Sequence, residues 1–447
     1  MAFGRVREVR AQIAVLSIAA AIVGGGTSGG CGGGRDEQVV ASALPADRTS
    51  AAAPPSSGSA APGTSADPTS TAAASAPPAS DVPPPNGAPE GKGIDTFEGL
   101  GGCKPATTTA SEYLQRGELT IAGRPDQFGL AWLVQLKGRA QIGFGGFDAQ
   151  AKQVARSRGV GSAREHAPRL FATGDDWTLA WFDDEGLAYA RPRFALQPAP
   201  EIEHLSSVRD VPADDVALAA APDGSLLAAS TFGAGGQLSL FLFAPVDGSA
   251  PKARALGLTK HAKGPRRPAA SADASGYTLA WVESDGSIAA TRFDRDGKEL
   301  GVSSAIVSGV GERTGLGIAP LGEGSLLVWT ESGEVRARVL DGAARPSSPM
   351  WRVGRGQWAT VASRGPDVVV SWVGEADGQP QQLLAARVGT AGPASKGRRV
   401  TSGGAVEAPG VVAVAGGRVA FAWTEKMSPA IQSFRAQLRT VDATCFD

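Results

Sequence analysis

The chain has 447 residues, with 43 Lys and Arg against 44 Asp and Glu, so its net charge at pH 7 is −1. This balance argues against a nucleic-acid-binding protein, which needs a basic face. Three His and three Cys exclude a His- or Cys-rich metal protein, and we expect neither a metal nor a cofactor.

The N-terminus has the layout of an export signal. Three arginines in the first ten residues precede an apolar run, residues 11–23, that is too short to span a bilayer comfortably. Small residues 24–30 then lead to Cys31. This order resembles a bacterial lipoprotein signal, which implies that residues 1–30 are removed and that Cys31 carries a lipid. Ser28 stands where that family usually has Leu, and the alternative is an ordinary cleaved signal peptide with Cys31 incidental.

The resemblance implies a localisation outside the cytoplasm. A lipid on Cys31 would anchor the protein in the cell envelope, with the outer membrane or the cell surface favoured. Residues 31–96 hold no aromatic residue and are dominated by Ala, Pro, Ser, Gly and Thr. Such a segment cannot bury enough apolar surface to offset its ordering entropy, so we expect a disordered tether. It serves either as a spacer that lifts a domain off the membrane or as a linker with no length requirement.

Residues 97–447 read as one repeated unit. A short apolar strand that contains Trp recurs, with Ser in place of Trp in the third copy, and we call these seven positions the markers. Their spacings run from 43 to 51 residues. A period of this length made of short strands predicts an all-β fold, a seven-bladed β-propeller. The markers are Trp132, Trp181, Ser230, Trp281, Trp329, Trp372 and Trp423.

Each unit has the same expected order of strands. A strand ends in a Gly-rich turn, the marker strand follows, and a tight Asp-Gly or Ser-Gly turn suits a hairpin. A third strand carries Arg before Phe or Val, and a polar fourth strand ends the blade. These units resemble the "VVW-x-[DE] … DG … RV" repeats of secreted bacterial β-propeller proteins, which implies the fold and an extracellular setting but no assigned activity.

An acidic residue stands two positions after four of the markers. We expect it to form a cross-strand ion pair with the arginine of the third strand. Because the pattern recurs in most blades, we interpret it as structural and not catalytic. The pairs are Trp181/Asp183, Trp281/Glu283, Trp329/Glu331 and Trp423/Glu425, and the arginines are Arg193, Arg292, Arg338 and Arg387.

The two ends of the repeated region are expected to meet. The third strand of the last unit, residues 433–441, leaves almost no chain for a fourth, which residues 105–115 are placed to supply. Cys103 precedes that segment and Cys445 follows the last strand. We therefore predict a Cys103–Cys445 disulfide that closes the ring, which an exported protein permits.

One polar residue per unit lies 14 to 16 positions before the marker, where the innermost strand of a blade is expected to begin. Its identity changes from unit to unit, as expected for a ligand-binding channel mouth. The alternative is that these side chains pair with one another or contact only water. The seven are Arg116, His166, Asp215, Arg267, Arg313, Gln357 and Glu407.

No phosphate-binding loop, dinucleotide motif or nucleophile elbow is present, so we assign no catalytic residue and expect no enzyme. Three tryptophans outside the marker positions, Trp177, Trp351 and Trp358, are expected to be buried. The sequence favours a membrane-tethered binding module for an unknown protein, peptide or glycan, with no nucleic-acid partner. A propeller enzyme that acts on a glycan or peptide at the channel mouth is the alternative, and a structural part of an envelope assembly is a third possibility.

Overall fold

The computed structural model describes part of the chain, and all of the described residues lie in one compact unit, residues 76–447. The predicted signal, Cys31 and nearly all of the predicted tether lie outside the described residues. The described residues are 91, 93–114, 118–136, 139–157, 160–161, 168–173, 176–183, 186–190, 202–205, 215–232, 237–246, 249–258, 264–301, 304–309, 312–394, 396–403, 405–428 and 431–447.

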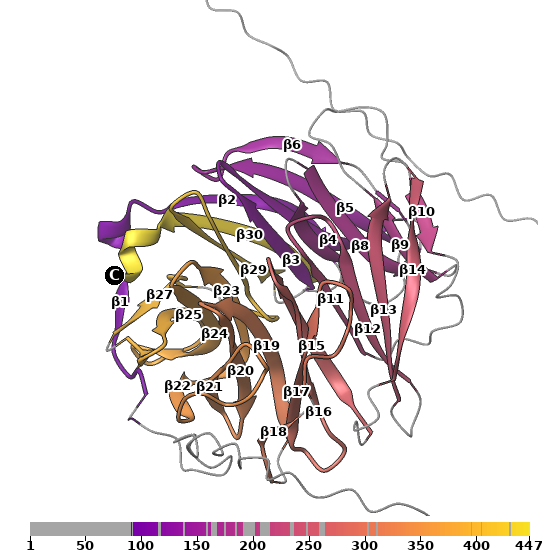
Figure 1. Ribbon diagram of the computed structural model, residues 1–447. Coiled ribbons are helices and arrows are strands. Elements are labelled where there is room, and N and C mark those ends of the chain that lie inside the picture. The colour runs from indigo at the N-terminus through magenta and orange to yellow at the C-terminus, as the bar shows by residue number, and fades with distance from the viewer. Residues whose placement is uncertain are drawn as a thin grey trace, which may run out of the picture. The chain divides into compact units, whose positions relative to one another are not determined.

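Within these residues the strands form seven sheets arranged as the blades of a β-propeller (Figure 1), which confirms the predicted fold. The innermost strand of each blade contacts the innermost strands of its two neighbours, so the ring is closed. From blade 1 to blade 7 these strands are β3 (Leu119–Arg124), β7 (Arg169–Thr173), β11 (Asp215–Ala220), β15 (Arg266–Asp273), β19 (Arg313–Leu321), β23 (Gln357–Arg364) and β28 (Val411–Ala415).

The second strand of each blade contains the marker residue. These strands are apolar runs because both faces of the sheet are covered by neighbouring blades. Every described residue of the second strands of blades 4 and 5 is buried. The seven are β4 (Gln127–Leu136), β8 (Asp176–Asp183), β12 (Leu226–Phe232), β16 (Gly276–Val282), β20 (Gly324–Glu331), β24 (Asp367–Ala376) and β29 (Arg418–Ser428).

The third and fourth strands complete antiparallel meanders. The third strands are β5 (Arg139–Asp148), β9 (Gly186–Ala190), β13 (Gln237–Val246), β17 (Ile288–Asp294), β21 (Glu334–Leu340), β25 (Gln379–Gly389) and β30 (Ile431–Asp442). The outer strands of blades 1 to 6 are β6 (Gln153–Ser157), β10 (Ile202–Leu205), β14 (Ser249–Leu258), β18 (Ser304–Val307), β22 (Trp351–Arg355) and β27 (Gly397–Arg399), with β26 (Gly392–Pro393) also on the third strand of blade 6.

The core is divided among the blade interfaces. Each of seven apolar clusters joins two neighbouring blades in the described part of the chain. Each marker Trp packs against the preceding blade, as Trp329 of blade 5 does against Ala280 and Ile288 of blade 4. In blade 3 the marker is the smaller Ser230, and Leu218, Leu226 and Phe243 pack against the preceding blade instead.

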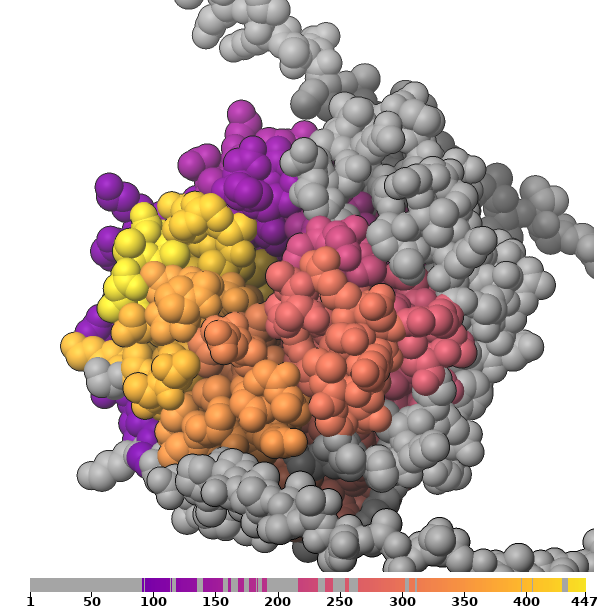
Figure 2. All heavy atoms as spheres, in the orientation of Figure 1, coloured from indigo at the N-terminus to yellow at the C-terminus, as the bar shows by residue number. Residues whose placement is uncertain are grey.

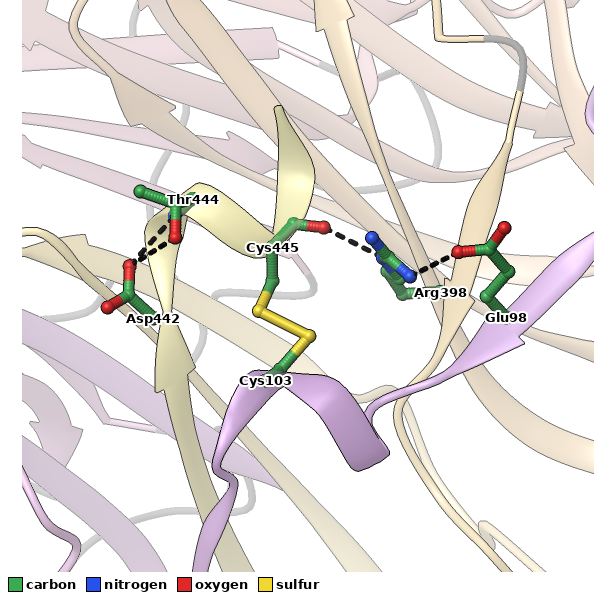
Figure 3. Close-up of a disulfide and its surroundings, with 6 residues drawn as sticks. All are labelled: Glu98, Cys103, Arg398, Asp442, Thr444 and Cys445. Atoms are coloured by element: carbon green, nitrogen blue, oxygen red, sulfur yellow. Dashed lines mark hydrogen bonds and ion pairs between the residues drawn. A yellow bond between two sulfur atoms is a disulfide. The ribbon is translucent and has the colours of Figure 1, made fainter.

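The last blade is built from both ends of the repeated region. Strand β2 (Ala106–Leu114) pairs antiparallel with β30, as the strand count predicted. Figure 2 shows the first described segments, in indigo, beside the last, in yellow. A short 3₁₀ helix, η1 (Gly101–Cys103), and a second one, η3 (Ala443–Phe446), bring the two cysteines together. The disulfide Cys103–Cys445 joins them with a Cα–Cα distance of 5.7 Å (Figure 3).

The residues before this closure form an arm, residues 93–103, that lies along the outer edges of blades 5 and 6. Ile94, inside the segment assigned to the tether, is buried, and its N–H donates to the Val353 carbonyl at 2.7 Å. Strand β1 (Phe97–Gly99) then pairs in parallel with β27. The Phe97 ring lies edge-on to Trp372, with 5.9 Å between ring centroids. The arm therefore covers two strand edges that would otherwise be open to pairing.

Candidate functional site

Five blades share a common level at or near the start of the inner strand. In each of these blades, one residue pairs with the residue that follows the marker on the second strand. The side chains at this level differ in charge and size, although the backbone geometry repeats. The five residues are Asp215, Arg266, Thr314, Gln357 and Glu407, the last through a hydrogen bond from its N–H to the Thr424 carbonyl.

A β-bulge follows this level in blades 4, 5 and 6. Two residues of the inner strand there lie opposite one marker Trp. The first bulge residue has a left-handed backbone: φ is 51° at Arg267, 59° at Gly315 and 57° at Trp358. Glycine adopts this conformation freely, whereas a bulky side chain pays a steric penalty that the surrounding fold must hold in place. Bulges at the rim of a closed sheet typically re-aim a side chain.

Four of the predicted mouth residues lie at the starts of described inner strands. Asp215 and Gln357 open β11 and β23, Arg313 opens β19, and Arg267 is the second residue of β15. Nothing is described of the Asp215 side chain, and Arg116 and His166 lie outside the described residues. Glu407 lies four residues before β28 and is exposed.

Two of these positions are out of step with the others. Arg267 lies one residue after the common level and Arg313 one residue before it, where Arg266 and Thr314 stand. The spacing to the marker changes by one residue at a time because the bulges and turns vary in length. The distance in sequence from the marker therefore predicts the correct end of each inner strand, but it does not predict which residue lies at the common level.

The Arg313 side chain is committed to the fold. It is buried, and its Nη2 donates to Oε1 of Glu331 at 2.8 Å. Its Nη1 donates to the carbonyls of Gly286 and, at 2.9 Å, Gly309. The guanidinium therefore ties blade 5 to blade 4, which supports the alternative interpretation, pairing within the protein, for this one residue.

Arg267 is held more loosely. Its Nη1 donates to the Arg313 carbonyl, and its Nη2 lies 3.7 Å from Oε1 of Glu312. The Arg267 side chain is 40% exposed and that of Glu312 is 82% exposed, so solvent screens this ion pair and its contribution to stability is small.

Gln357 and Glu407 leave their side chains exposed, on either side of the junction between blades 6 and 7. Trp358, the bulge residue after Gln357, is half-buried, with its ring against the apolar cluster that joins these two blades. Of the three tryptophans expected to be buried, Trp177 and Trp351 are, whereas Trp358 keeps part of its surface open. Its position just after the predicted mouth residue Gln357 was the signal that sequence reasoning passed over.

The arginines predicted for the Trp-x-acid motifs are the wrong ones in the described blades, but a cross-strand ion pair does form in blades 5 and 7, with Arg336 and Arg435 of the third strands. In two motifs the acid also accepts the indole N–H: Trp281 Nε1 donates to Glu283 and Trp423 Nε1 to Glu425, each at 2.8 Å. Arg292 pairs with Asp273 at 2.6 Å. The reason is distance along the strand, because Arg292 lies opposite Thr278, five residues before Glu283, or about 17 Å away.

Two of the remaining arginines are likewise far from the acids of their motifs. Arg338 is fully buried and donates to the carbonyls of Ser348 and Ile306 at 3.0 and 2.8 Å. Arg387 lies 3.5 Å from Asp367. Glu331 and Glu425 do form cross-strand ion pairs, with Arg336 at 2.6 Å and with Arg435 at 2.9 Å. The motif is structural, as interpreted, with a different set of partners.

One described tyrosine, Tyr277, belongs to a hydrogen-bond chain that ends on a carboxylate, but its hydroxyl is not accessible at the surface. Tyr277 is fully buried, its hydroxyl lies 2.5 Å from Ser225 Oγ, and Ser225 donates to Asp223 at 2.6 Å. Burial raises the pKa of the Tyr277 phenol, which keeps it protonated as a link between blades 3 and 4.

Among the described residues, no His, Cys, Asp and Glu side chains gather in a group of three or more that suits a metal ion. In the same residues no helix has the length and apolarity needed to cross a membrane.

No protein-family model matches the chain, and no curated protein matches its sequence. Solved structures match its fold at low identity. The BP39L lectin from Burkholderia pseudomallei is 14% identical with a TM-score of 0.50, and the match covers 74% of this chain and 97% of the lectin. AofleA from Arthrobotrys oligospora is 12% identical with a TM-score of 0.46, over 67% of this chain and 90% of that one.

A polysaccharide lyase, Uly1, is 7% identical with a TM-score of 0.43, and the match covers 72% of this chain and 89% of the lyase. At 14% identity, the similarity to BP39L supports the β-propeller fold alone and says nothing of activity.

Proposed function

We propose that the protein is a membrane-tethered, extracytoplasmic binding module, and that the mouth where the inner strands begin holds its ligand. The observation that carries this proposal is the common level of five unlike side chains on a repeated backbone. A side chain that serves the blade recurs from blade to blade, as the marker Trp does. Side chains that differ at one repeated position are free to fit a ligand that is not symmetric.

The chemistry at the junction of blades 6 and 7 suits a glycan. Gln357 offers an amide that donates and accepts, Glu407 offers acceptors for hydroxyl groups, and Trp358 offers part of an apolar ring. These groups together match a sugar, which has hydroxyl groups at its edge and an apolar face. The lectin named among the similar structures binds sugars on the same fold, which makes glycans the first ligands to test. The tether and the lipid on Cys31 rest on the sequence.

The test is a glycan array probed with the purified full chain, followed by titration of the best glycan against single variants. Gln357→Ala and Glu407→Ala are expected to weaken binding by about tenfold each, the loss of one or two hydrogen bonds. Glu323→Ala is the matched control, because Glu323 is an exposed carboxylate in the turn at the other end of the inner strand of blade 5. Equal binding by all four proteins would contradict a mouth site.

A further inference from the structure

A hollow lies on the face of the ring opposite the mouth, where blades 6 and 7 meet. It has a volume of about 660 Å³, within the range of small-molecule sites. Its wall is formed by the turn from β23 to β24, the turn from β28 to β29, and the end of β30 with the start of η3. Each of these turns lies at the far end of an inner strand from the mouth, so this cavity is distinct from the mouth site.

Glycines keep the wall of this cavity open. A Cβ placed on Gly365 or on Gly417 would meet no atom within 4 Å, so these two positions face open space, whereas Gly416 beside Gly417 is packed against the Pro125 carbonyl. Both glycines have left-handed backbones, with φ of 73° and 72°. The left-handed backbone favours glycine at both positions, and because glycine has no side chain, the space beside Gly365 and Gly417 stays open.

Two arginine side chains border the cavity, and each has a guanidinium N–H donor without a hydrogen-bond partner in the described structure. Arg364 donates through Nη2 to Oδ1 of Asp447 at 2.6 Å, while its Nη1 is buried with no partner in the described structure. Arg418 donates through Nη2 to Thr440 Oγ1 at 3.2 Å, and its buried Nε is unpartnered in the same residues. A buried N–H without an acceptor is costly, so a small rotation of either side chain toward an acceptor in the cavity is favourable.

An ionised acceptor stands opposite Arg418. Oδ1 of Asp442 accepts from the Thr444 N–H at 3.0 Å and from the Thr444 hydroxyl at 2.8 Å, as drawn in Figure 3. These hydrogen bonds, with the charges of Arg418 and Lys104, hold the pKa of the Asp442 carboxyl below its ordinary value. The carboxylate is exposed, and its Oδ2 accepts no hydrogen bond in the described structure, which leaves it free to accept from a ligand hydroxyl.

We propose that this cavity binds a small carboxylate ligand that carries neighbouring hydroxyl groups, such as a hexuronic acid. Arginine presents a planar fork of N–H donors that matches a carboxylate, and two such groups border one wall. Asp442 would repel a ligand made only of anionic groups but would accept from a hydroxyl beside the carboxylate. A neutral sugar would offer the guanidinium groups only hydroxyl acceptors, without the charge-assisted, bidentate contact that a carboxylate makes. This inference does not depend on the mouth site and would stand if the mouth bound nothing.

The experiment is isothermal titration of the full chain with glucuronate, with glucose as the neutral match and glucose 6-phosphate as the other oxyanion. We expect glucuronate to bind with a millimolar or tighter Kd and glucose not to bind. Arg418→Gln and Arg364→Gln should each weaken glucuronate binding by about tenfold. Arg418→Lys keeps the charge but loses the planar fork of N–H donors, so its affinity for glucuronate should lie between those of the parent and of Arg418→Gln. Arg345→Gln is the control, an exposed arginine in a turn on the same face.

Thermal unfolding of each variant separates lost binding from lost folding, because Arg364 also pairs with Asp447. No binding of glucuronate by the folded protein would overturn the proposal, as would equal binding of glucose. Preference for glucose 6-phosphate would overturn the assignment of a carboxylate. Glucuronate binding that survives both arginine changes but is lost in Glu407→Ala would place the ligand at the mouth, against this inference and in favour of the proposed function.

Discussion

The two faces of the ring differ in how far they repeat. On the face opposite the mouth, three turns between third and fourth strands use the same device: an aspartate Oδ1 accepts the N–H four residues later, at 2.8 Å in each case. At the mouth the backbone level repeats, but its side chains do not. Chemistry that recurs in many blades serves the fold, and chemistry that occurs once marks where the molecule meets a partner. The cavity between blades 6 and 7 fits this rule, because it lies where the repeat ends.

The largest effect should come from the one covalent element of the closure. Replacing both Cys103 and Cys445 by Ser removes a link between residues 342 positions apart. The chain-entropy model gives about 5–6 kcal/mol for such a loop, and measured losses are typically about 2–5 kcal/mol. Denaturant unfolding of the oxidised protein measures the loss. Cys31→Ser is the control and should leave the free energy of unfolding unchanged. A double variant within about 0.5 kcal/mol of the parent would show that strand pairing alone closes the ring.

The turn between the first and second strands of blade 4, on the face opposite the mouth, should give a smaller, pH-dependent effect. Burial by itself would raise the pKa of Asp273, but hydrogen bonds from Arg292 and Ser275 and the Arg292 charge outweigh it and hold the pKa below its ordinary value. We expect Asp273→Asn to cost about 1.5–3 kcal/mol at pH 7, the range for hydrogen bonds to a charged group.

The sign of the pH dependence follows from the lowered pKa. Stabilisation by ionised Asp273 is present above its unfolded pKa of about 3.9 and is lost as the pH falls through the lower folded value. Thermal unfolding at pH 7, 5 and 3 should therefore show the gap between parent and Asp273→Asn narrowing at pH 3. Exposed Asp296 supplies the control variant, Asp296→Asn. A gap that widened on acidification would be inconsistent with this role.

The repeated aspartate turns should be interchangeable. Asp341→Ala and Asp294→Ala each remove an Oδ1 acceptor for the N–H four residues on. We expect each to cost about 0.5–1.5 kcal/mol in urea unfolding and to leave ligand binding unchanged. Losses that differed by more than about 2 kcal/mol would mean that the two turns are not equivalent.

The mouth residues should matter least for stability. Gln357→Ala and Glu407→Ala remove exposed side chains, so we expect unfolding free energies within about 0.5 kcal/mol of the parent, while ligand binding falls. Differential scanning calorimetry of the same samples used for titration provides the comparison. A clear destabilisation by either change would assign that residue to the fold and remove it from the site.

The repeat and the closure could be predicted from the sequence because both rest on local patterns. The marker residues all lie in second strands, and the strand missing from the last unit is supplied by β2. The arm could not be predicted in this way. Strand β1 pairs in parallel with β27, 300 residues on, and a three-residue strand carries no periodic signal.

The site was predictable to the level of a strand end. Counting back from the markers found the starts of inner strands, but a bulge shifts register by one residue without any change of residue type. Trp358 was therefore assigned to the core, and Arg313 to the mouth, although its guanidinium is buried against Glu331. The partners of Arg292 and Arg338 were missed because both lie at the far end of the blade from the acids of their motifs.

Hydrogen exchange of the full chain, with and without its best array glycan, tests the central claim most directly. If the ligand binds at the mouth, slowed exchange should appear at the starts of β23 and β28 and at Glu407, while the turns at Glu323 and Asp341 stay unchanged. Protection confined to the turns of the opposite face or to the outer strands, with none at residues 357–360 or 407–411, would contradict the account.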